Sequence, residues 1–376
     1  MKSSFMPEYN KTYDCAIIGG GIAGLSLSIQ LAEKGFEVIV FEKNTYPFHR
    51  VCGEYISNES LDFILRLGLP LKEMDLPQIN KIGISTSGGF KLQAPLPLGG
   101  FGISRYKLDY ELNLLAKAKG VTILEKCKVT NHENNTVDTD KGIFHAKIVV
   151  AAFGKTTPAF AKTETLKPSL ANYVGVKYHI KTDFPADTIE LHNFNKGYCG
   201  ISKIEEDKFC LCYLTHNVNL HHNNNSIQEM ENNVIRKNPF LNHIFSNSDF
   251  LFEHPVTISN IKFGAGKTSK NNHLYLGDAA GCISPLTGNG ISMSAYASFL
   301  LSDLIHQYLK EKISYEQLLI QYDLQWKRYF EKRIWRGKKI QQLFENSYLQ
   351  ELVFRLVQPF GKIKSLLITS THGKPF

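Results

Sequence analysis

The sequence predicts an α/β protein in which a parallel sheet is interleaved with an antiparallel sheet and followed by C-terminal helices. Three observations lead to this prediction. A glycine-rich turn joins a short apolar strand to a helix near the start of the chain. A second glycine-rich segment follows another short strand at residues 273–276, and residues 171–259 change to the alternating pattern of antiparallel strands. The 376 residues suffice for two domains. We expect 1–75, 101–170 and 263–310 to form the nucleotide-binding domain, 76–100 and 171–262 the antiparallel domain, and 311–376 a helical region.

Composition and patterning exclude several classes of protein. Hydrophobic residues make up 43% and charged residues 21% of the chain, an ordinary globular balance. No stretch reaches the roughly eighteen apolar residues that cross a bilayer, and residues 1–14 lack the apolar core of a signal peptide, so we expect a cytoplasmic protein. The cysteines are scattered without a C-x-x-C pair, which argues against disulfides and zinc. We expect no metal site, and His221 and His222 in a solvated Asn-rich loop.

The formal charge of +8 is spread over most of the chain, so we expect no nucleic-acid partner. One segment stands out: residues 326–339 (WKRYFEKRIWRGKK) carry seven Lys or Arg against one Glu. Two interpretations stay open for it. It is either a solvated helix face or a surface that meets an anionic membrane or a lipid-like substrate, which would make the protein peripheral to a membrane.

The first nucleotide-binding segment is a strand at 13–18, a glycine turn, and a helix that starts with Ile22 and Ala23 and ends near Gly35. Gly19, Gly21 and Gly24 satisfy G-x-G-x-x-G. The first glycine permits a tight turn, the second lets a pyrophosphate approach the backbone, and the third lets the helix pack on the strand. The free N–H groups at the helix start then face the anion.

A second strand at 37–41 ends at Glu42 and Lys43. A carboxylate at this position accepts hydrogen bonds from the adenosine ribose and disfavours a 2′-phosphate. The site is therefore predicted to take FAD or NAD rather than NADP, with both residues at the cofactor.

The second nucleotide-binding segment begins after a strand at 273–276 with Gly277 and Asp278, and a long helix is expected over 291–310. The acid at the strand end can accept a ribityl hydroxyl. The small and turn-forming residues that follow the acid let the chain cross close to a flat ring. The residues expected at the cofactor here are Pro285, Gly288, Asn289, Gly290 and Ile291.

These two segments, in this order, resemble the FAD-dependent family that includes aromatic-hydroxylase-type monooxygenases, flavin halogenases and geranylgeranyl reductases. The resemblance implies a Rossmann-like FAD-binding domain, FAD as the cofactor, Asp278 at the ribityl chain, and residues 288–290 beside the isoalloxazine ring. It also implies an Arg at position 105 that approaches the flavin or pyrophosphate, and cofactor contacts at Val129, Ala152 and Gly154.

The chain departs from the hydroxylases of this family at residue 153. They have Asp-Gly after the strand at 148–154, whereas this chain has Phe153-Gly154. No second G-x-G-x-x-G is present, so we expect NADPH or NADH, if used, to be a transient reductant. Residues 49–54 resemble a geranylgeranyl reductase segment, which implies that Arg50, Cys52 and Gly53 line the flavin.

Two residues, Cys52 and Tyr198, are catalytic candidates. Cys52 either tunes the flavin or donates a proton, or is a small packed residue. Tyr198 either lines the cavity or packs in a core. We expect first a reductase or dehydrogenase acting on an apolar isoprenoid- or polyketide-like molecule. The alternatives are an NAD(P)H-dependent monooxygenase and a non-catalytic prenyl-binding escort protein.

Overall fold

The computed structural model describes residues 11–161, 172–261, 263–270, 273–345, 347–359 and 373–376. The expected absence of a signal peptide, insofar as it concerns residues 1–10, and the part of the expected C-terminal helical region over residues 360–372 lie outside these ranges. Within them, no helix combines the length and the apolarity that crossing a bilayer requires.

The first sheet is mainly parallel, and the two glycine-rich turns follow the carboxyl ends of its strands β1 and β18. It runs in the order β17 (Ser269–Lys270), β18 (His273–Tyr275), β9 (Gly142–Ala151), β1 (Thr12–Ile18), β2 (Val38–Phe41) and β6 (Thr122–Leu124). A hairpin, β7 (Val129–Glu133) and β8 (Thr136–Thr139), continues antiparallel from β9. Ile18 of β1 pairs with Ala151 of β9, and Tyr275 of β18 pairs with the same Ala151, so the loops that follow these strands meet.

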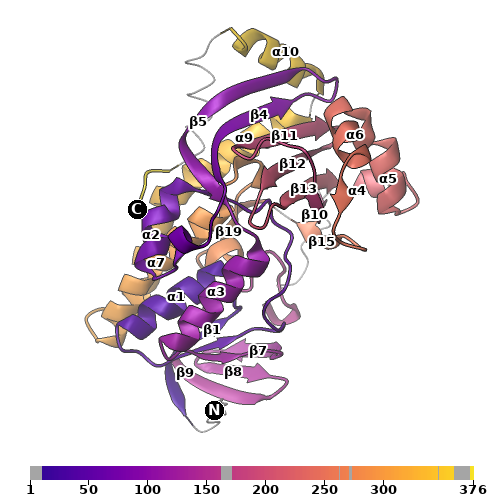
Figure 1. Ribbon diagram of the computed structural model, residues 1–376. Coiled ribbons are helices and arrows are strands. Elements are labelled where there is room, and N and C mark those ends of the chain that lie inside the picture. The colour runs from indigo at the N-terminus through magenta and orange to yellow at the C-terminus, as the bar shows by residue number, and fades with distance from the viewer. Residues whose placement is uncertain (1–10, 162–171, 262, 271–272, 346, 360–372) are drawn as a thin grey trace.

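Helices cover one face of this sheet and the hairpin covers the other (Figure 1). The helical layer comprises α1 (Ile22–Glu33), α3 (Arg105–Ala118) and α7 (Gly290–Leu309), with α2 (Leu61–Arg66) beside them. The strands are apolar almost throughout because both faces are buried: β2 is buried at every position.

The second sheet is mostly antiparallel and stands above the first in the view of Figure 1. Its order is β14 (Asp249–Phe250), β10 (Tyr173–Lys181), β13 (Phe209–His216), β12 (Gly197–Lys203), β11 (Thr188–Phe194), β4 (Gln78–Ser85), β5 (Lys91–Gly102) and β3 (Tyr55–Ser57), with β15 (Val256–Ile261) on β10. A two-residue pairing of β16 (Gly264–Ala265) with β19 (Gly281–Cys282) lies apart from both sheets.

Alternation along these strands divides the second sheet into two faces. The outer face packs on α4 (Asn217–His221), α5 (Ile227–Asn233) and α6 (Pro239–Ser246). The inner face carries the intervening residues of the same strands, in cross-strand rows such as Gly200, Cys212 and Lys177. The predicted α/β fold, with a parallel sheet interleaved with an antiparallel one, is confirmed.

The C-terminal helices are α8 (Tyr315–Trp326), a π-helical turn (Lys327–Glu331), α9 (Lys332–Glu345) and α10 (Ser347–Val357). One local expectation is wrong. His221 closes the short helix α4 instead of lying in a loop, and His222 caps it. The His216 side chain accepts a hydrogen bond from the Val218 amide and so starts this helix within an Asn-rich segment.

Candidate functional site: two glycine-rich segments around one dinucleotide site

The turn after β1 requires glycine because other backbone lies against it. Gly19 has φ +113°, and a Cβ there would lie 2.5 Å from the Ala152 carbonyl oxygen. A Cβ at Gly24 would lie 2.1 Å from the carbonyl oxygen of Gly19. The first and third glycines therefore act in packing, and Ala152 at the end of β9 supports the turn. By contrast, a Cβ at Gly21 would meet only the Arg105 guanidinium, at 3.8 Å.

Glu42 follows β2 and is 3% exposed. Its Oε2 accepts a hydrogen bond from the Gly20 amide at 3.1 Å and forms an ion pair with Arg50 Nη2 at 3.0 Å. Its Oε1 accepts a hydrogen bond from the Asn44 amide at 3.0 Å. These contacts fix the acid at the edge of the turn, where the sequence predicts the ribose contact.

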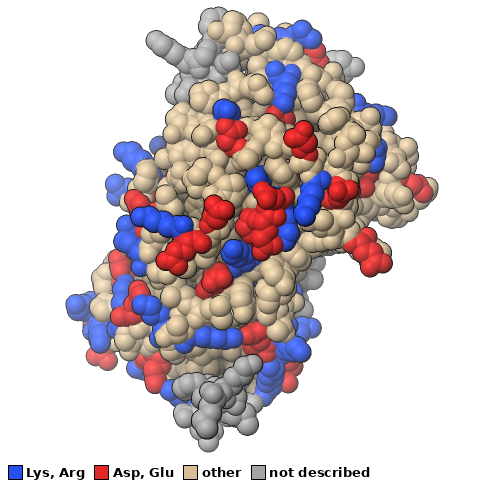
Figure 2. Space-filling model, in the orientation of Figure 1, with Lys and Arg blue, Asp and Glu red and all other residues tan. Residues whose placement is uncertain are grey.

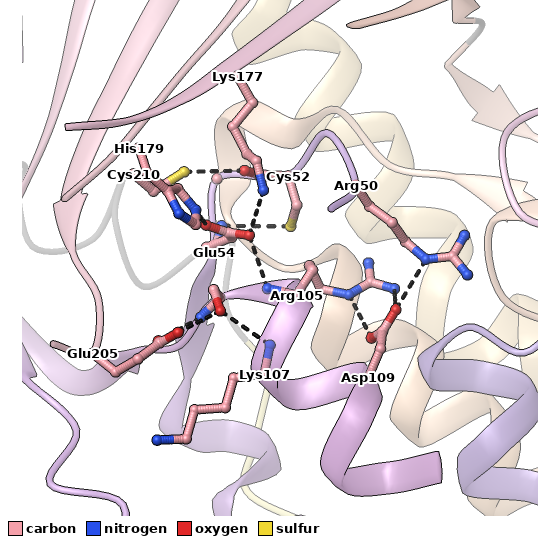
Figure 3. Close-up of polar contacts among 12 residues, drawn as sticks. Arg50, Cys52, Glu54, Arg105, Lys107, Asp109, Lys177, His179, Glu205 and Cys210 are labelled. Atoms are coloured by element: carbon pink, nitrogen blue, oxygen red, sulfur yellow. Dashed lines mark hydrogen bonds and ion pairs between the residues drawn. The ribbon is translucent and has the colours of Figure 1, made fainter. Parts of the chain in front are cut away.

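Two arginines share one buried carboxylate beside the turn (Figure 3). Arg105 Nε donates to Asp109 at 2.7 Å, and Arg50 Nε donates to the same carboxylate at 2.9 Å. Asp109 is 1% exposed. Burial opposes the charge of Arg105, but Asp109 raises its pKa above the ordinary value. A permanently charged guanidinium therefore stands next to Gly21, as a pyrophosphate requires.

The second segment, residues 277–290, packs directly on the first, and we call it the flavin segment. Gly277 has φ +66°, and a Cβ there would lie 2.9 Å from the Ala23 side chain at the start of α1. Arg105 interacts electrostatically with Asp278 as well as with Asp109. Gly21 and Asp278 thus both lie near a single arginine, and the two distant segments meet at one site.

Several glycines around this site face open space. A Cβ at Gly53 or at Gly154 would have nothing within 4 Å, and one at Gly290 would have only Ile283, at 4.0 Å. Gly288 has φ +66°, and a Cβ there would lie 3.1 Å from the Tyr55 ring. Open glycine faces on three different segments fit a long, flat cofactor that runs from the turn to the end of the flavin segment.

Comparison with known proteins agrees with this geometry. Residues 17–62 match the NAD(P)-binding Rossmann-like domain. Conditioned medium factor receptor 1 of Dictyostelium discoideum is 26% identical over 84% of this chain and 67% of its own length. Digeranylgeranylglycerophospholipid reductase of Methanococcus vannielii is 24% identical over 86% and 84%. Two solved structures share the fold at a TM-score of 0.78: the flavin-dependent brominase Bmp2 (17% identity, 96% and 93% covered) and a geranylgeranyl bacteriochlorophyll reductase-like protein of Thermoplasma acidophilum (18%, 97% and 97%).

The chain is thus similar in sequence to these reductases and shares the fold of the flavin-dependent brominase and of the reductase-like protein. A nucleotide turn joined to a second segment at 277–290 fits FAD, because FAD needs both a phosphate site and a ring site.

The other residues that the sequence predicts at the cofactor lie on several different segments. Lys43 is exposed beside Glu42, and Val129 is half-buried at the start of β7. Pro285 opens a short helical turn in the flavin segment, and Asn289 precedes α7, with Ile291 buried in its first turn. Their contacts with FAD stay predictions.

Cys52 lies in a loop that is held between the two sheets (Figure 3). Its Sγ accepts a hydrogen bond from the Glu54 amide at 3.4 Å, and its carbonyl oxygen accepts one from the Cys210 thiol at 3.2 Å. The Gly53 carbonyl oxygen accepts a hydrogen bond from Ser202 at 3.4 Å. The loop is therefore fixed to β12 and β13, and Cys52 stays half-buried beside the core around α1 and α7.

A buried ion cluster behind Cys52 was missed from the sequence. Lys177 Nζ lies 2.7 Å and His179 Nε2 lies 2.6 Å from the two oxygens of Glu54, and Glu54 also accepts the Arg105 amide at 2.8 Å. Burial alone would raise the pKa of Glu54, but the Lys177 charge and the His179 hydrogen bond lower it to about 2. The signal was present: a Lys and a His lie two residues apart on one face of a largely apolar strand, β10.

Lys155 is the second residue that the sequence analysis missed. It follows Gly154 on the loop after β9 and interacts electrostatically with Asp278, Cys282, Cys52 and Cys212, which come from three other segments. Burial opposes its charge, but Asp278 raises its pKa above the ordinary value. A cation therefore stands in the loop where related hydroxylases have an acid.

Tyr198 is 7% exposed and packs in an apolar cluster on the inner face of the second sheet. Burial raises its pKa well above the ordinary value. Burial likewise raises the pKa of Cys212 to about 12. Tyr198 and Cys212 are thus neutral at physiological pH, and Lys155 and Arg105 carry positive charge near the flavin segment.

Proposed function

We propose that this protein is an FAD-dependent reductase or dehydrogenase that acts on a carbon–carbon double bond of an apolar, isoprenoid- or polyketide-like molecule. Digeranylgeranylglycerophospholipid reductases from several archaea, at 23–25% identity over most of this chain, support the reaction class. The Cys52-Gly53 pair, similar to their segment, and the absence of an acid at Phe153 favour the reductase over a hydroxylase.

One structural observation supports an apolar substrate. An apolar cluster joins Leu286 of the flavin segment to Tyr198 and Leu214 of the second sheet and to Phe354 of α10. The surroundings of the flavin segment are therefore aliphatic and aromatic on the side of the second sheet. A polar aromatic substrate would find few hydrogen-bond partners there.

When bound, reduced FAD supplies a hydride to one carbon of the double bond. The residues of this chain bind and orient the cofactor, exclude water and supply the proton. Gly21 and Arg105 hold the pyrophosphate, Asp278 orients the ribityl chain, and the aromatic residues exclude water from the reacting carbons. Cys52 holds the proton that the neighbouring carbon must receive. Lys155 keeps positive charge beside the segment where negative charge develops.

The decisive experiment is anaerobic. The yellow protein is reduced with NADPH, NADH or dithionite and mixed with a geranylgeranyl-bearing glycerolipid, while the flavin absorbance is followed. We expect reoxidation without oxygen and a product that is two hydrogens heavier. Reoxidation that requires oxygen and gives a hydroxylated product would establish a monooxygenase instead, and a protein purified without flavin would favour an escort protein.

A variant pair tests the role of Cys52 within this scheme. Cys52→Ala should retain FAD, because the backbone carbonyls of Cys52 and Gly53 still accept hydrogen bonds from Cys210 and Ser202 and hold the loop. It should lose turnover by roughly a hundredfold, the usual contribution of a positioned acid. Cys52→Ser should recover part of it. Full activity in Cys52→Ala would show that Cys52 only packs.

A further inference from the structure

One face of the C-terminal helical run from α8 to α9 is buried against the core of the protein. Its buried stripe is spaced at every fourth residue and is at most 4% exposed: Leu318, Tyr322, Trp326, Phe330 and Ile334. Arg333 reaches back from this run to the buried Glu59 at 2.8 Å. The stripe and this ion pair attach the run to the core, so its opposite face is not needed for folding.

The opposite face nevertheless carries large apolar side chains. Ile320, Leu324 and Trp335 are 53%, 63% and 60% exposed. A folded protein keeps single apolar residues on its surface without consequence, but a line of them on one helix face indicates a contact surface. We define these three residues, together with the basic residues between and after them, as the outer helix face.

The charge of the outer helix face is predominantly positive. Six of the seven Lys and Arg between residues 327 and 339 are exposed, against the single acid Glu331. Lys327 is paired with Asp323, whereas Lys332, Lys338 and Lys339 form no ion pair with a described residue. On the face drawn in Figure 2 the two signs are instead interspersed. Lys339 Nζ lies 5.9 Å from the centre of the Trp335 ring, which puts a cation and an amphipathic ring together.

The outer helix face lies directly behind the flavin segment. The ring of Trp326, on the buried side of the same helix, lies 2.7 Å from where a Cβ of Gly281 would be. Gly281 follows Asp278 by three residues in the flavin segment. Whatever binds the outer face therefore lies one helix diameter, about 10 Å, from the segment that holds the cofactor.

We propose that the outer helix face docks this protein on an anionic lipid bilayer. Exposed Trp and Leu at the headgroup level and lysines beside them are the combination that anionic interfaces bind, through apolar burial and electrostatic attraction together. The contact is peripheral, because the other side of the same helical run is buried in the core of the protein. Docking rests on and deepens the proposed function, since it brings the flavin segment to the place where an isoprenoid lipid is found.

Flotation with vesicles of equal parts phosphatidylcholine and phosphatidylglycerol tests the proposal with the intact holoprotein. We expect it to float with these vesicles, to bind pure phosphatidylcholine much less, and to dissociate as salt is raised. Lys338→Gln and Lys339→Gln should each weaken binding about fivefold, the effect of about 1 kcal/mol per basic residue at an anionic surface. Leu324→Ser combined with Trp335→Ser should weaken it roughly tenfold or more.

Matched controls come from other exposed positions. Ile143→Ser removes a 55% exposed side chain from the β8–β9 hairpin, and Lys72→Gln and Lys181→Gln remove exposed lysines elsewhere. Vesicle binding should be unchanged in all three. Equal losses in the controls and in the outer-face variants, or binding that ignores lipid charge, would overturn the proposal. So would dimerisation in solution that the Leu324 and Trp335 changes abolish.

Intrinsic fluorescence gives an independent readout. The chain has two tryptophans, of which Trp326 is 3% exposed. A blue shift on adding anionic vesicles therefore reports Trp335, and Trp335→Phe should remove the shift while leaving flavin absorbance intact. No shift in the wild type would contradict docking. Neither assay uses turnover, so docking and the proposed reaction fail or succeed separately.

Discussion

At the scale of single residues, the effect of the Lys155 charge on the cofactor can be measured separately from its effect on folding. It carries a positive charge among Asp278, Cys52, Cys212 and Cys282. Since reduced flavin is anionic, a nearby cation stabilises the reduced state and raises the midpoint potential of the bound cofactor. Because the pKa of Lys155 is raised above its ordinary value of 10.5, its charge persists across neutral pH and is lost only in strong alkali.

Replacing this charge gives the first prediction. Lys155→Met should lower the midpoint potential of bound FAD by about 30 mV or more, equivalent to tenfold in the two-electron equilibrium, and Lys155→Arg should keep it near the wild-type value. A dye-equilibration titration measures both. Lys147→Met, on the strand that precedes this loop and with a side chain 59% exposed, is the control and should leave the potential unchanged. Identical potentials in Lys155→Met and wild type would remove Lys155 from the flavin's surroundings.

Glu54 provides a second prediction, on stability. Glu54→Gln leaves Lys177 as a buried charge without its partner and should lower the free energy of unfolding by about 3–5 kcal/mol. The pKa of Glu54 is about 2 in the folded protein against an ordinary 4.5. The stabilisation is therefore complete above pH 4.5 and is lost as the pH falls toward 2.

Urea unfolding at several pH values measures both consequences. The wild type should lose the Glu54 contribution between pH 4.5 and 2, and the variant should not show this component. Glu206→Gln breaks an exposed pair with Lys208, in which the Glu206 side chain is 65% exposed, and should cost less than about 1 kcal/mol. If the two variants were equally stable, Glu54 would not hold the Cys52 loop and β10 together.

At the scale of secondary-structure elements, the π-helical turn keeps the C-terminal helices in register with the core. Residues of an α-helix are about 100° apart, so a stripe at every fourth residue drifts about 40° per step. The wider turn at Lys327–Glu331 rotates less per residue and offsets this drift. Phe330 and Ile334 therefore remain buried, at 0% and 4% exposure, in line with Leu318.

Deleting one residue from this turn should be much milder than inserting one after it. A π-helical turn holds about one residue more than an α-helical turn, so removal of Tyr329 restores regular α-helix and leaves the following residues close to their present orientation. Insertion of one alanine after Lys332 instead rotates the following residues by about 100°, so Ile334 leaves the core and Arg333 leaves Glu59. We expect the insertion to lower the free energy of unfolding by about 3 kcal/mol or more and the deletion to lower it clearly less. Thermal unfolding of the two variants measures the difference, and equal losses would show that the turn does not set the orientation of α9.

The elements that hold the cofactor were predictable because their signals are local. Strand, glycine turn, helix and acid follow one another within thirty or so residues around Gly19 to Glu42, and steric contacts of Gly19 and Gly24 explain the glycines. Strand ends were placed within a few residues, except that β9 starts at Gly142, where alternating polar residues conceal a strand that is half-covered by the hairpin. The π-helical turn leaves no sequence signal of its own.

The contacts that complete the site were not predictable because they join distant residues. Glu54 meets Lys177 across 123 positions, and only the meeting of the two sheets brings them together. Lys155 looks like an ordinary loop lysine until Asp278 and Cys52 are placed around it. The resemblance pointed to Arg105, but not to its shared carboxylate, Asp109, which looks like a surface helix residue yet is 1% exposed.

At the scale of the whole molecule, the candidate cofactor site is assembled from segments that are far apart along the chain. The phosphate turn, Arg105 and the flavin segment each belong to a different part of the first domain, and the Cys52 loop bridges to the second sheet. A ligand that contacts all of them binds only the folded chain. It therefore stabilises the fold as a whole by mass action.

Removing FAD should accordingly lower the stability of both sheets together. With FAD at about a hundred times its dissociation constant, the stabilisation is about 2.7 kcal/mol, and the stripped protein should melt in one transition at a lower temperature. Asp278→Ala should lose FAD on purification and melt at the temperature of stripped wild type, with no response to added FAD. Cys52→Ala, by contrast, should melt with its FAD like the wild type. A stripped protein whose second sheet melts at the unchanged temperature would show that the cofactor site does not join the two sheets.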